Sequence, residues 1–171
     1  MEQESWDSSD QKAHELDISI FGTHEEIHQK AEMPRRAYSF DEANKIIDTL
    51  INKPLVSVHG LTAFVSKNSA KEMLSGKAVK SSFERPAHLL AVVNVDKLFS
   101  NAVEPWNFGV NPQKPNEGLK AIRRLYSPML YDSRIVLVKL TVKEMKNQNE
   151  GNRLYSLKAI DVDAGKKSGC R

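Results

Sequence analysis

Two histidines lie where their side chains could transfer protons. His59 falls at a His-Gly hinge between two short apolar stretches, and His88 follows Pro86 in the first turn of an expected helix. Metal-free cleavage of RNA needs a base for the 2′-hydroxyl, an acid for the leaving oxygen and cations for the pentavalent phosphorane. His59 and His88 are therefore the candidates for proton transfer, and a purely structural role is the alternative for each.

The segment RIVLVKLTVKEM, residues 134–145, has two alternating sets of side chains. The apolar set comprises Val136, Val138, Leu140 and Val142. The other set ends in Lys139, Thr141 and Lys143. Because successive side chains of a strand point to opposite faces of a sheet, we expect the apolar set to be buried and the basic set to lie on the other face.

The neighbouring strands extend this basic face if the three strands pair in sequence order. Ser156 and Lys158 then share the face, with Tyr155, Leu157 and Ala159 opposite. Either Arg123 or Arg124 joins it, and the sequence does not decide which. Such cations can bind phosphates, and hydroxyls can bind sugars or bases. The alternative is an ordinary solvated sheet face on which lysine and threonine prevent aggregation.

The sequence HEEIH, His24–His28, has the spacing of a zinc peptidase site. Two imidazoles one helical turn apart can bind zinc, and Glu25 would then be the general base. Thr23 and Glu26, however, form a capping-box pattern that places His24 in the first turn of its helix. We therefore expect an exposed helix start, no metal and no other cofactor, and keep the zinc peptidase as a remote alternative.

The hydrophobic pattern predicts an α+β fold, with N-terminal helices packed on a C-terminal antiparallel meander of about four strands. The predicted helices span residues 23–33, 39–52, 67–76 and 86–102. The predicted strands are a short one at 16–22, two hinged at His59-Gly60 within 55–66, and three long ones at 119–131, 133–145 and 152–163. The Pro- and Gly-rich residues 103–118 are expected to form a long loop, and such loops are often functional.

Length and composition predict one domain. The chain has 171 residues, 40% of them hydrophobic, which fits a single globular unit at residues 17–163 with an acidic, flexible lead-in at 1–16 and a flexible tail at 164–171. Cys170 is the only cysteine, so an internal disulfide is excluded. No apolar stretch is long enough for a membrane span, and the N-terminus does not have the pattern of a signal peptide.

The charge of the chain is unevenly distributed. Residues 1–33 hold nine Asp or Glu and two Lys, a net charge of −7, which leaves +10 on the remaining residues. A basic body of this size favours an anionic partner, and nucleic acid is the commonest. The alternative is that the acidic segment docks on the basic body and compensates its charge.

The order of VHGLTAFVSKNSAKEM, PAHLLAVVNVDKLF, AIRRLYSPML, VKLTVKE and LYSLKAIDV resembles domains of phage and mobile-element polyvalent proteins and of polymorphic toxins. Those domains look similar to the barnase, EndoU, colicin E5/D and RelE group of RNases, which have N-terminal helices and a four-stranded antiparallel sheet. The resemblance covers about residues 54–163, and the strands LTVKE and LYSL are its most specific parts.

The resemblance implies a metal-independent endoribonuclease acting as a toxin or effector domain. The positions that match its polar pattern are His88, Lys139, Thr141, Lys143, Tyr155 and Ser156. From these and from the basic face, we expect catalytic roles for His88, His59, Lys139, Thr141 and Ser156, and substrate-binding roles for Lys143, Arg123, Arg124, Tyr155 and Lys158. The expected partners are RNA, with tRNA as one candidate, and an inhibitor or immunity protein. The expected site of action is the cytoplasm, after delivery as part of a larger phage or secreted protein. Lys158 stands where the pattern often has an acidic residue, and a non-catalytic domain that binds nucleic acid or protein is the alternative.

Overall fold

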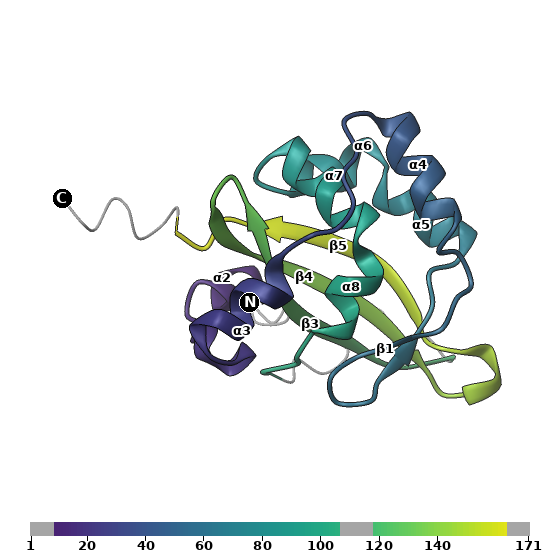
Figure 1. The fold of residues 1–171 in the computed structure, drawn as a ribbon. Helices are drawn as coiled ribbons and strands as arrows, with labels where there is room; N and C mark the ends of the chain where they lie inside the picture. Colours follow the sequence, from purple (N-terminus) through teal and green to yellow (C-terminus); the bar gives the residue numbers. More distant parts are fainter. Residues whose placement is uncertain (1–8, 107–117, 164–171) are drawn as a thin grey trace.

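A three-stranded antiparallel meander forms the centre of the fold in the computed structural model, which describes residues 9–106 and 118–163 (Figure 1). Strands β3 (Leu119–Tyr131), β4 (Arg134–Met145) and β5 (Arg153–Ile160) pair in sequence order. Strands β1 (Leu55–Val56) and β2 (Thr62–Ala63) form a separate small hairpin. The predicted α+β class is confirmed, and the meander has three strands where about four were expected.

Seven short α-helices accompany the sheets in the described ranges. They are α2 (Ser9–Ala13), α3 (His24–Ala31), α4 (Phe40–Asp48), α5 (Lys67–Met73), α6 (Gly76–Ser81), α7 (Arg85–Val93) and α8 (Val95–Ser100), with 3-10 turns η1 (Ile18–Phe21) and η2 (Gln148–Glu150). None of these helices is long and apolar enough to cross a membrane. The strand predicted at residues 16–22 is wrong, because Asp17 caps the 3-10 turn η1 by accepting a hydrogen bond from the Ser19 N–H. Most of the predicted loop, residues 107–117, lies outside the described residues.

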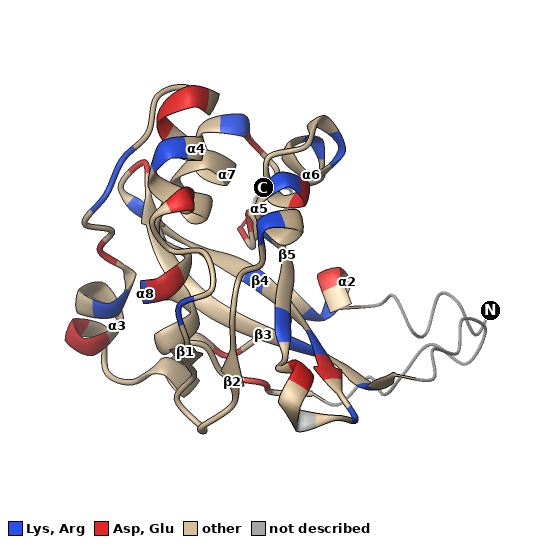
Figure 2. Ribbon diagram, turned by 90° about the vertical axis from the view of Figure 1, so that its right-hand side faces the viewer, with Lys and Arg blue, Asp and Glu red and all other residues tan. Residues whose placement is uncertain are grey.

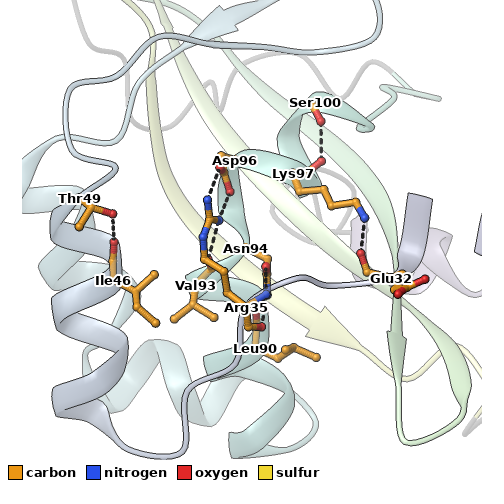
Figure 3. A network of polar contacts seen from close by, with 10 residues as sticks. All are labelled: Glu32, Arg35, Ile46, Thr49, Leu90, Val93, Asn94, Asp96, Lys97 and Ser100. Carbon is orange, nitrogen blue, oxygen red and sulfur yellow. Dashed lines mark hydrogen bonds and ion pairs between the residues drawn. The ribbon is translucent and has the colours of Figure 1, made fainter. Parts of the chain in front are cut away.

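The helix predicted at residues 86–102 is interrupted at Asn94, which separates α7 from α8. The buried Asn94 amide donates to the carbonyls of Leu90 and Arg35 and accepts from the Arg35 N–H. The Arg35 guanidinium donates two hydrogen bonds to Asp96, at 2.7 and 3.0 Å, and one to the Val93 carbonyl (Figure 3). This network ties the segment after α3 to the junction of α7 and α8.

The main core lies between one face of the meander and helices α4, α5, α7 and α8 (Figure 1). The apolar set of β4, from Val136 to Val142, is fully buried in it, as the alternation predicted. Helices α7 and α8 contribute Ala91, Val92, Leu98 and Phe99, among others. The prediction that this side of the sheet is buried is thus confirmed.

The opposite face of the meander is covered at one end by the N-terminal segment. Phe21 and Ile27 pack with the outer-face residues Tyr126, Leu137 and Ile160 in a second apolar cluster. At the C-terminal end of α3, Lys97 of α8 donates hydrogen bonds to the carbonyls of Gln29 and Glu32. The segment predicted as a flexible lead-in therefore includes a helix, α2, that packs with this cluster through Ala13.

Leu140→Ala should lower the free energy of unfolding by about 2–5 kcal/mol, because Leu140 is fully buried on the central strand and its loss leaves a cavity. Denaturant unfolding measures the change. Val58→Ala is the control, since Val58 is 52% exposed and its truncation should cost less than about 0.5 kcal/mol. Equal losses in the two variants would contradict the assignment of the core.

Candidate functional site

A pocket of about 340 Å³ lies where helices α5 and α6 meet the outer face of the meander. Its polar lining from the sheet comprises Arg124, Lys139, Thr141, Tyr155, Ser156 and Lys158. Its polar lining from the helices comprises Glu72, Ser75, Lys77 and Ser81. We call this set of residues the basic pocket, because its lining holds four cations and one carboxylate. The predicted basic face is therefore enclosed on one side and is not an open surface.

The strand register explains why these side chains meet. Arg124, Thr141 and Ser156 are direct neighbours across the three strands. Lys139 and Lys158 face each other one step along the sheet. Side chains opposite each other in adjacent strands lie close enough to interact, so this register brings three cations and two hydroxyls together. It also assigns Arg124 to the predicted basic face.

A β-bulge changes the place of Tyr155. Thr141 pairs with Ser156 while Val142 pairs with Leu154, so Tyr155 is the extra residue in β5. The sequence predicted Tyr155 on the core face, and that placement is wrong because a bulge shifts the alternation by one residue. Tyr155 instead lines the basic pocket, and the Lys143 Nζ lies 4.5 Å from the centre of its ring. Lys143 itself is exposed next to the pocket.

Asp10 of helix α2 supplies the counter-charge for two of the pocket lysines. Its Oδ1 accepts a hydrogen bond from Lys139 Nζ at 2.6 Å, and its Oδ2 accepts one from Lys158 Nζ. Lys139 also donates to Ser9 Oγ at 3.0 Å, and the Tyr126 hydroxyl donates to the Ser9 carbonyl at 2.9 Å. Figure 2 shows the acidic colour of α2 beside the basic colours of the sheet. Within the described residues, the acidic segment thus contacts the basic body through Asp10, in agreement with one of the two interpretations of the charge pattern.

Burial and ion pairing act against each other at this contact. Burial lowers the pKa of Lys139 below its ordinary value, and the nearby Asp10 only partly offsets this. The positive charges of Lys158 and Arg124 add to the lowering. For Asp10, burial alone would raise the pKa, but the two lysines outweigh it, so the pKa lies below the ordinary value. Lys139 therefore holds its proton less firmly than an ordinary lysine does.

The helical part of the pocket lining was missed by sequence reasoning. Lys77 and Ser81 lie in α6, which was not predicted, because the helix predicted at residues 67–76 ended where α6 begins. Ser75 is its N-cap and accepts a hydrogen bond from the Ala78 N–H at 3.2 Å. The S-G-K sequence at residues 75–77 was the available signal, because serine before a new turn is a typical helix cap.

His88 does not line the basic pocket. Its side chain is fully buried, with Nε2 donating to the Met73 carbonyl at 2.6 Å. The Ser82 hydroxyl lies 2.6 Å from Nδ1 and accepts from the Ala159 N–H at 2.9 Å. Since a carbonyl can only accept, Nε2 carries the hydrogen and neutral Nδ1 accepts from Ser82. His88 therefore links α7 to β5 as a core residue, which corrects its predicted place in the site.

His59 and Arg123 lie together in another cavity, of about 360 Å³, beside the β1–β2 hairpin. Arg123 Nε donates to Glu104 at 2.7 and 2.9 Å, and its Nη1 donates to Glu144 at 2.9 Å. These hydrogen bonds, mainly those with Glu104, raise the pKa of the guanidinium above its ordinary value. Arg123 pairs with Val142, whose side chain faces the core, so Arg123 is not on the sheet face that lines the basic pocket. His59 lies with Arg123 in the second cavity and is also outside the basic pocket.

The capping box predicted at the start of HEEIH is confirmed. The Glu26 N–H donates to the Thr23 hydroxyl at 3.2 Å, and the Thr23 N–H donates to Glu26 Oε1 at 2.8 Å. His24 is therefore in the first turn of α3, with its ring centre 4.4 Å from that of His28. Residues 9–106 and 118–163 contain no group of three or more His, Cys, Asp or Glu that could hold a metal ion.

Comparison with known protein families matches residues 39–155, more than two thirds of the chain, to the family described as Large polyvalent protein-associated domain 3. The match confirms the polyvalent-protein context of the resemblance, and the likeness to the RNase group stays a prediction. The matched range includes α4 to α8 and the residues of the basic pocket up to Tyr155. Ser156 and Lys158 of the pocket lie outside it, as do α2 and Asp10. Neither the curated proteins nor the solved structures give a match to this chain.

The core position of His88 predicts a pH dependence of stability. Burial lowers its pKa, so below about pH 6.5 the unfolded chain takes up a proton that the folded chain does not. As the pH decreases below that point, the free energy of unfolding should decrease by up to about 1.4 kcal/mol per pH unit because of this group. His88→Gln should reduce this slope in denaturant unfolding at pH 7.5, 6.5 and 5.5. Identical slopes in the two proteins would contradict the lowered pKa of His88.

Proposed function

We infer that this chain, which belongs to the Large polyvalent protein-associated domain 3 family, binds RNA through its basic pocket. The observation that supports this inference best is the composition of the pocket lining. Among the described residues, four cations and five hydroxyls line one cavity, with Glu72 as the one carboxylate of that lining. Guanidinium and ammonium groups are the usual protein partners of phosphates, and hydroxyls add hydrogen bonds to sugars.

Single-stranded RNA fits this pocket better than a duplex. A hollow that is closed on one side by α5 and α6 can admit an extended strand, whereas a rigid helix needs a wide, open surface. Tyr155, together with neighbouring Lys143, adds an aromatic ring beside the cations, and nucleobases stack on such rings. The excess of basic residues outside the acidic segment would also draw a polyanion toward this side.

Lys139→Ala combined with Lys158→Ala should weaken RNA binding and its dependence on salt. Each lost phosphate contact should reduce the slope of log K against log salt by about 0.7 for a single strand. Fluorescence anisotropy with an unstructured RNA oligonucleotide and with tRNA, at several salt concentrations, measures both quantities.

Lys45→Ala combined with Lys53→Ala is the matched control, because both lysines are exposed and lie outside the pocket. It removes the same two positive charges without touching the pocket and should change affinity less than about twofold. If the control weakens binding as much as the pocket variant, the affinity comes from general charge, and the pocket is not the binding site.

A metal-independent endoribonuclease is the second candidate, and the lowered pKa of Lys139 favours it. A neutral Lys139 amine could take the 2′-hydroxyl proton, after which that oxygen attacks phosphorus. The bond from phosphorus to the 5′-oxygen then breaks, the leaving oxygen takes a proton, and a 2′,3′-cyclic phosphate forms. Arg124 and Lys158 would stabilise the charge on phosphorus. As part of a polyvalent protein, such a domain would act as a toxin or effector on cellular RNA.

Cleavage of total RNA and of tRNA in the presence of EDTA tests this second candidate. Lys139→Met keeps the length of the side chain without a proton-transfer group and should slow cleavage by about 10²–10⁴-fold. His59→Gln should leave the rate unchanged, because His59 lies in the other cavity. RNA that is bound but intact after prolonged incubation would contradict cleavage and support binding without catalysis.

A further inference from the structure

Helix α2 places a carboxylate against two lysines of the basic pocket, where the proposed function requires an anion. The two Asp10 oxygens bind one lysine each, Lys139 and Lys158, in the way that two oxygens of one phosphate would. Lys139 is only 12% exposed in this arrangement, so α2 and the pocket together enclose its ammonium group. An incoming phosphate can therefore reach both lysines only after Asp10 has moved.

We propose that α2 is a tethered competitor that occupies two lysines of the basic pocket, Lys139 and Lys158, until RNA displaces it. This inference rests on the proposed function and adds the regulation of the same site. A competitor that belongs to the chain lowers the apparent affinity by the fraction of molecules in which the pocket is open. The domain therefore binds weakly any ligand that offers a single charge, and responds to ligands that offer several phosphates.

The contacts of α2 suit a helix that can detach. It has five residues, too few to be stable as an isolated helix. Besides the Asp10 contacts, Lys139 donates to the Ser9 hydroxyl and the Tyr126 hydroxyl donates to the Ser9 carbonyl. Ala13 is buried, and the Lys12 Nζ lies 5.6 Å from the centre of the Trp106 ring. These contacts are few, and Asp10 is itself 37% exposed.

The chain that follows α2 is anchored independently of it. Phe21 is 2% exposed in the second apolar cluster. Lys30 donates a hydrogen bond to the Phe21 carbonyl at 2.6 Å. The capping box fixes the start of α3. Release of α2 therefore does not require η1 or α3 to leave the sheet, and the residues between Ala13 and Asp17 can serve as the tether.

Replacing Asp10 by asparagine tests the competition in the full chain. Asp10→Asn removes the charge that holds both lysines, and it should tighten binding of the unstructured RNA oligonucleotide by about tenfold at fixed salt. Glu15→Gln is the matched control: it removes the same charge from an exposed side chain of the same acidic segment, five residues away. Its affinity should stay within about twofold of the wild type.

Amide hydrogen exchange of the unmodified protein provides a second readout that needs no variant. The amides of residues 9–13 should exchange faster when RNA is bound, because the displaced helix loses its contacts. Slower exchange would mean that RNA covers α2 in place, which overturns the proposal. Equal affinities of Asp10→Asn and Glu15→Gln would overturn it as well, while binding by the wild type would keep the proposed function. If no protein binds RNA, the proposed function fails, and the competition fails with it.

Discussion

The charge of Lys139 is the constraint on which the arrangement of the outer sheet face depends. An ammonium group on the central strand, only 12% exposed, is costly unless an anion or other polar groups compensate it. Asp10 and Ser9 provide that compensation in this structure. Their position requires the N-terminal segment to reach the outer face of the meander. One lysine thus connects the path of the chain to the proposed site.

The two faces of the meander differ in composition and in what packs on them. The inner face is continuous with the apolar surfaces of α4, α5, α7 and α8, and this core supplies most of the stability. The outer face has an apolar region around Leu137 and Ile160, where the N-terminal segment packs. Between these regions, His88 and Ser82 join α7 to β5 by hydrogen bonds. The core therefore positions the edge of the basic pocket without contributing a reactive group to it.

The sequence predicted the inner and outer faces of β4 because a period of two residues decides them directly. It could not predict which arginine joins the outer face, because that depends on the register between β3 and β4. It also misplaced Tyr155, since a bulge of one residue leaves no mark in the alternation. His88 and the contact of Asp10 with Lys139 depend on residues that lie far apart in the chain, and no local pattern reports such contacts.

The most direct test of the central claim is a crystal structure of the protein with a short single-stranded RNA. A phosphate group should lie between the Nζ atoms of Lys139 and Lys158, near the position that the Asp10 carboxylate occupies now, with α2 displaced from the sheet. The claim would be contradicted by RNA bound elsewhere on the surface while Asp10 keeps its hydrogen bonds to both lysines.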